Sequence, residues 1–89
     1  MAGTPVTECG RMVNITSTSL ISSSPAQLIG FYVNSSSGGT IVLRDAGASG
    51  VAVSGTITPA IGFHCFPGVF TQSIHATIAN TLDVTFFIL

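Results

Sequence analysis

Short β-prone runs separated by clusters of turn residues are the feature that most limits how this chain can fold. Val, Ile and Thr dominate the runs, and their branched side chains favour strands over helices. Gly, Ser, Pro and Asn interrupt the runs at residues 22–25, 34–39 and 46–50. The pattern predicts an all-β fold, a single antiparallel β-sandwich or jelly-roll-like domain of about seven short strands.

The expected strands cover residues 12–21, 27–34, 40–44, 51–58, 62–66, 73–78 and 82–88. The last one has the clearest alternation, because Leu82, Val84, Phe86 and Ile88 share one face. Residues 73–78 repeat this alternation, so we expect the last two strands to form a hairpin around residues 79–81.

Two segments indicate that other surfaces cover this domain. In residues 27–34, Ile29, Phe31 and Val33 are expected on one face and Leu28, Gly30 and Tyr32 on the other, which makes both faces apolar. Residues 84–89 are uncharged and strongly β-prone, so they should lie inside the sheet or against a partner. We expect removal of the last few residues to abolish assembly.

The length of 89 residues suits one domain, with residues 1–11 as an N-terminal arm and residues 12–89 as the β-sandwich domain. The N-terminus lacks the basic and apolar regions of a secretory signal, so we expect the chain to be made and used without export. Cys9 and Cys65 are then expected to be free and at least partly buried thiols.

Charge is very scarce, with two basic and three acidic residues and no lysine. Two cations cannot neutralise a run of phosphates, which excludes nucleic-acid binding by counterion release and also binding to anionic membranes. An apolar share of 46% with so little charge predicts a protein that buries much of its surface against copies of itself or a larger assembly.

Few side chains could support catalysis, so we expect no enzyme, no cofactor and no metal. Ser73, His75 and Asp83 could be drawn as a triad, but among so many serines such a triple arises by chance. His64 and Cys65 could bind a metal together with His75, although their spacing fits no known ligand pattern. Packed strand residues are the simpler interpretation.

Aromatic residues are the more informative candidates. Phe63, Phe66 and Phe70 form the densest cluster, which suits the core, an intersubunit contact or a sugar-stacking surface. Arg44 and Asp45 could pair with each other, pair across an interface, or remain a solvated strand-end pair.

Four phrases of the sequence, at residues 30–34, 39–45, 56–64 and 82–86, read GFYVN, GTIVLRD, TITPAIGFH and LDVTF. In this order they resemble small β-sandwich structural proteins of the virions of tailed bacteriophages, of the capsid decoration or cement type. The resemblance covers about two thirds of the chain, and residues 1–27 are not part of it.

The resemblance implies a non-enzymatic homotrimer on the capsid surface, assembled in the host cytoplasm, that binds the major capsid protein or another virion protein and stabilises the head. We expect Phe63, Phe66, Phe70 and Phe87 to form the oligomer or capsid contacts. The alternatives are a tail or fibre module that binds a receptor or sugar, and a structural component of the tail or the head–tail junction.

Overall fold

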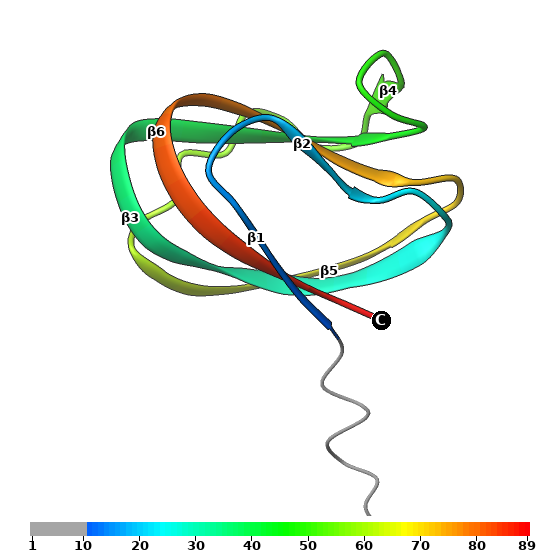
Figure 1. Ribbon diagram of the computed structural model, residues 1–89, viewed down its shortest axis with the longest axis horizontal. Helices are drawn as coiled ribbons and strands as arrows, with labels where there is room; N and C mark the ends of the chain where they lie inside the picture. The colour runs from blue at the N-terminus through cyan, green and yellow to red at the C-terminus, as the bar shows by residue number, and fades with distance from the viewer. Residues whose placement is uncertain (1–10) are drawn as a thin grey trace, which may run out of the picture.

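The computed structural model describes residues 11–89, which form one antiparallel sheet of six strands and no helix (Figure 1). The expected all-β class is confirmed. The strands are β1 (Arg11–Ile15), β2 (Ser19–Ser22), β3 (Ala26–Asp45), β4 (Val51–Ala52), β5 (Gly62–Phe70) and β6 (Ile74–Ile88). Residues 1–10 of the expected arm lie outside the described residues, and Arg11 already belongs to β1.

Two long strands hold the sheet together. β3 pairs with β6 from Leu28 opposite Ile88 to Asp45 opposite Ile74. β1 and β2 pair with the other edge of β6, whereas β5 and β4 pair with the other edge of β3.

The hairpin expected around residues 79–81 is wrong, because β6 runs without a break through this segment. The turn residues at 34–39 likewise do not end β3. Gly38 and Asn80 instead have positive φ angles of 65° and 61°, and the Asn80 side-chain amide donates to the Gly38 carbonyl at 2.8 Å. Turn-forming residues on two paired strands therefore bend both strands together.

The bend folds the sheet over on itself, so that its two halves face each other (Figure 1). We call them the β5 half, with β1, β5 and the adjoining parts of β3 and β6, and the β4 half, with β2, β4 and the remaining parts. The described strands do not close into a barrel, since β5 pairs only with β3 and β1 only with β6.

The other expected strands also differ from those observed. Residues 12–21 are divided between β1 and β2, and residues 51–58 form only the two-residue β4 plus a bridge from Ile57 to Ile41. β5 extends four residues beyond the expected end, to Phe70. The number of strands is therefore six rather than seven.

Alternation in β6 is confirmed, because Leu82, Val84, Phe86 and Ile88 are all buried. In β3 the face prediction fails at one point, where the ladder to β6 has an extra residue between Leu28 and Gly30. This bulge puts Leu28, Phe31 and Val33 in the core and leaves Tyr32 exposed.

Inward side chains from both halves form a single core. It comprises Ile15, Ile21, Leu28, Phe31, Val33, Ile41, Leu43, Phe70, Ile74, Ala76, Leu82, Val84, Phe86 and Ile88.

Candidate functional site

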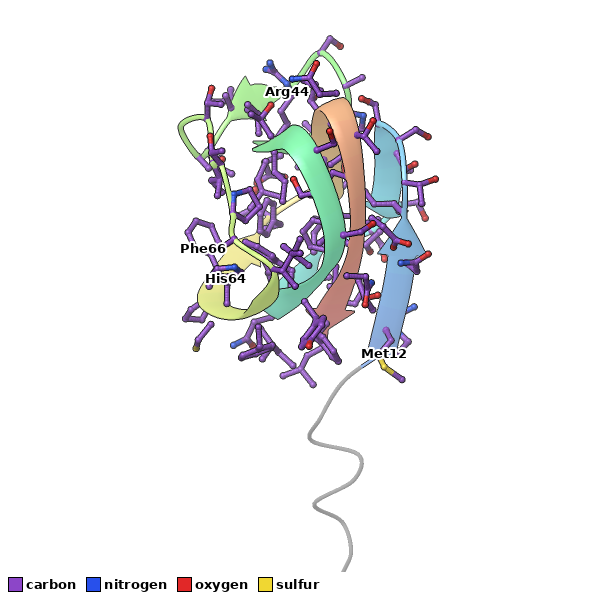
Figure 2. The ribbon with its side chains drawn as sticks, turned by 90° about the vertical axis from the view of Figure 1, so that its left-hand side faces the viewer. Met12, Arg44, His64 and Phe66 are labelled. Atoms are coloured by element: carbon purple, nitrogen blue, oxygen red, sulfur yellow. The ribbon has the colours of Figure 1, made fainter. Side chains whose placement is uncertain are left out.

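Exposed apolar side chains concentrate along one edge of the sheet. Six of the ten large exposed apolar residues lie between positions 51 and 69, in β4, β5 and the segment between them. We call these six the apolar margin: Val51, Val53, Ile61, Phe63, Phe66 and Val69. Figure 2 shows Phe66 and His64 at this edge and Met12 at the opposite edge.

Electrostatics at this edge are unusual because no Asp, Glu, Lys or Arg occurs from Ala46 to Leu82. The six margin side chains are therefore uncharged, and the charged residues beside them are Arg44 and Asp45, which pair with β4 from the neighbouring strand β3. Apolar patches of this kind on a soluble protein mark contact surfaces.

A pocket of about 280 Å³ opens within the margin, between β5 and the segment after β4. Its lining is Leu28, Leu43, Val53, Ser54, Phe66, Pro67, Gly68, Val69 and Phe70. Gly68 stands opposite Leu28 in the β3–β5 ladder, and the side chains of such cross-strand partners lie on the same face of the sheet. A side chain at position 68 would therefore point inward, as Leu28 does, and its absence leaves space there. A Cβ built there would have Phe70 Cε1, at 4.0 Å, as its nearest neighbour.

The outer surface of the β5 half carries a second apolar group. Phe63 and Phe87 meet edge to face with ring centroids 5.9 Å apart. Both lie next to Gly30, whose lack of a side chain makes room for the Phe63 ring. Tyr32 is opposite Phe63, and Met12 is opposite Phe87, so the group extends across four strands.

The four aromatic residues predicted as contacts are thus divided between two places. Phe63 and Phe87 form the outer pair, and Phe66 lines the pocket while remaining exposed. Phe70 is only 4% exposed and belongs to the core. Its truncation would act through the fold, in accordance with the core interpretation of this cluster.

His64 and Cys65 do not form a metal site with His75. In residues 11–89 no three His, Cys, Asp or Glu side chains are close enough to hold a metal ion. His64 packs on Phe31, with centroids 5.2 Å apart, and its Nε2 lies 2.8 Å from the Ala60 carbonyl. Cys65 is a free thiol and is exposed, so the expected partial burial is wrong for this residue, and Cys9 lies outside the described residues.

Asp45 has a structural role that sequence patterns do not reveal. Its carboxylate accepts hydrogen bonds from the backbone N–H groups of Thr71, Gln72 and Ser73 and from the Thr71 hydroxyl, at 2.9–3.1 Å. These bonds, led by that from the Thr71 backbone, lower the pKa of Asp45 to about 2. Asp45 therefore ties the end of β3 to the β5–β6 connection.

Arg44 does not pair with Asp45. Its guanidinium donates to the Thr77 hydroxyl at 3.3 Å and to the Gly50 carbonyl at 3.2 Å. The neighbouring His75 is 5% exposed, and its Nδ1 has no hydrogen-bond partner. Burial, followed by the charge of Arg44, lowers the pKa of His75.

Asp83 belongs to a different group on the β5 half. Its Oδ1 accepts from the amides of Asn14 at 2.7 Å and Asn34 at 3.2 Å, and Thr85 accepts from the same two amides. Asp83 thus joins β1, β6 and β3 through side chains. The Ser73, His75 and Asp83 triple gains no support, because none of these residues is hydrogen-bonded to another through its side chain.

No protein-family model, curated protein sequence or solved structure matches this chain. In residues 11–89 there is no helix both long and apolar enough to cross a membrane. Among the described residues, the apolar margin is the surface feature that points most directly to a function.

Proposed function

We propose that this chain is a non-enzymatic structural protein of a bacteriophage virion, a homotrimer that decorates the capsid and stabilises the head. In this proposal the folded-over sheet acts as one sandwich-like unit, and its partners are copies of itself and the major capsid protein. The place of action is the capsid surface, reached by assembly in the host cytoplasm.

The apolar margin carries this proposal. Six exposed apolar side chains lie in a stretch of 37 residues, from Ala46 to Leu82, that contains no charge. An isolated protomer would leave this surface in water with little charge to keep it soluble. Burial against copies or a shell resolves the problem, and many modest contacts then act together on a multivalent lattice.

Light scattering after size-exclusion chromatography tests the proposal, together with binding to capsids assembled without this protein. We expect a stable oligomer that binds the shells and raises the temperature at which they open. Phe63→Ser should weaken assembly or shell binding, whereas Leu20→Ser, which removes a similarly exposed side chain on β2, should not. A monomer that ignores the shells would refute the proposal.

A tail or fibre module that binds sugar is the second candidate, supported by the exposure of Phe66 at a pocket. The pocket provides little for sugar hydroxyl groups. The Ser54 hydroxyl already donates to the Gly55 carbonyl and accepts from the Leu43 N–H. Binding to a glycan array that is lost in Phe66→Ala, from a protein that does not bind capsids, would favour this candidate.

A further inference from the structure

We propose that the pocket beside Gly68 receives an apolar side chain from the apolar margin of a second copy of this chain. The inference rests on the self-association in the proposed function and specifies where it takes place. In this arrangement the other five margin residues form the contact between copies, whereas Phe63, which also pairs with Phe87 in the outer group, is left free for the shell.

The pocket has the size and chemistry for such a side chain. A volume of about 280 Å³ accommodates an aromatic ring or a branched aliphatic group, since a cavity of about 150 Å³ already holds benzene. Leu28 and Leu43 are buried core residues that line it, and Val53 and Phe66 are exposed. The Ser54 hydroxyl is already hydrogen-bonded, so the lining favours an apolar occupant over water.

β5 favours contact through side chains over the addition of another strand. The ladder between β3 and β5 has a bulge between the pairs Leu28–Gly68 and Gly30–Cys65. At this bulge two residues of β5, Phe66 and Pro67, lie opposite one residue of β3, Ile29. Both this bulge and the missing N–H of Pro67 interrupt the free edge of β5. Such features protect edge strands from pairing with another sheet.

A second copy fits this surface better than an unrelated partner. The margin side chains carry no charge, and the two charged residues paired with β4, Arg44 and Asp45, have opposite signs and are hydrogen-bonded within the protomer, so bringing two margins together creates little repulsion between like charges. Contact between copies also removes both margins from water at once. The five margin residues other than Phe63 are 39–75% exposed, so a contact between two copies buries ten such side chains in one apolar interface.

Gly68→Leu is the decisive variant. A side chain at this position starts in open space, 4.0 Å from Phe70 Cε1, and Gly68 does not have a positive φ angle. The leucine should therefore fill the protomer's own pocket and leave the fold intact. The measurements are native mass by light scattering across a dilution series, thermal unfolding, and binding to capsids assembled without the protein.

We expect wild type to be oligomeric and Gly68→Leu to be folded, with a dissociation constant raised at least ~30-fold, as for a hot-spot residue. A folded Gly68→Leu that associates as wild type does would overturn the pocket inference and leave the proposed function standing. A monomeric wild type would overturn both. If Gly68→Leu does not fold, Val53→Asp replaces it, with Leu20→Asp on β2 as the matched control. Only Val53→Asp should dissociate the oligomer, and equal behaviour of the two variants would count against the inference.

Discussion

Gly30 and Gly68 lie on facing strands, and the same substitution should have opposite effects at the two positions. A Cβ on Gly30 would collide with the His64 carbonyl oxygen and would lie 3.1 Å from Phe63 Cζ and 3.3 Å from Cys65 Cα. Two of these neighbours are backbone atoms, so β5 itself would have to move. The Cβ of Gly68→Ala would make only an ordinary van der Waals contact, with Phe70 Cε1 at 4.0 Å.

The magnitudes follow from these surroundings. Gly30→Ala should cost about 1–3 kcal/mol of overpacking. Gly68→Ala should gain about 0.4–1 kcal/mol, because alanine restricts the unfolded chain and the native backbone needs no change. A difference of about 1.4–4 kcal/mol separates the two variants, which for a domain of this size is on the order of 6–32 °C in Tm.

Thermal unfolding followed by far-UV circular dichroism measures this difference, at a protein concentration where all variants have the same native mass. Denaturation in urea provides an independent value for the free energy of unfolding. Two results would contradict this reasoning: a Tm of Gly30→Ala at or above that of wild type, or equal Tm values for the two variants. In either case Gly30 is not in a close contact, or Gly68 is not beside an open pocket.

Three further predictions concern Asp45, His75 and the last four residues. The native state lowers the pKa of Asp45 from 3.8 to about 2. The stability that this carboxylate contributes should therefore be complete above pH 3.8 and be lost as the pH falls through 2. In urea titrations, Asp45→Asn should be less stable than wild type at neutral pH and should not show this loss of stability in acid. Burial lowers the pKa of His75 below 6.5, so the native state favours the neutral ring; stability should be greatest above pH 6.5 and decline below it, and His75→Gln should flatten the Tm profile between about pH 7.5 and about pH 5. Deletion of residues 86–89 removes two fully buried side chains, each worth about 2–5 kcal/mol, so calorimetry should show no cooperative unfolding, whereas Leu89→Ala, at an exposed position, should fold.

The alternation of apolar and other residues predicted the buried face best where it continues over several residues, as it does in β6. The buried face of β6 follows directly from Leu82, Val84, Phe86 and Ile88, since period-2 burial depends only on the strand's own sequence. The bend could not be predicted, because Asn80 and Gly38 look like ordinary turn residues until the ladder between β3 and β6 brings them side by side.

In the candidate site, too, the features that depend on long-range pairing could not be predicted from the sequence. The aromatic cluster suits the core as well as a contact surface, so its sequence does not show that Phe63 and Phe66 are exposed whereas Phe70, which pairs with Ala26 across the sheet, is buried. The pocket arises from Gly68 facing Leu28, and the Asp45 contact joins residues 26 to 28 positions apart. No local pattern encodes these long-range pairings, although an acidic residue just after an apolar run is a weak sign of a capping role.

The length shared by β3 and β6 has a consequence for how the chain acquires its structure. Every rung between them joins residues about 30 to 60 positions apart, a high contact order that favours slow folding. β1 and β2 also depend on β6 for their only described strand pairing, and β6 begins at Ile74. A chain interrupted before that residue retains only the pairing of β3 with β4 and β5 and has no strand with which β1 and β2 can pair. Because β1, β2 and β3 all pair with β6, a chain that ends before β6 cannot form the complete sheet. We therefore expect such truncated chains to be excluded from an assembly built from complete ones.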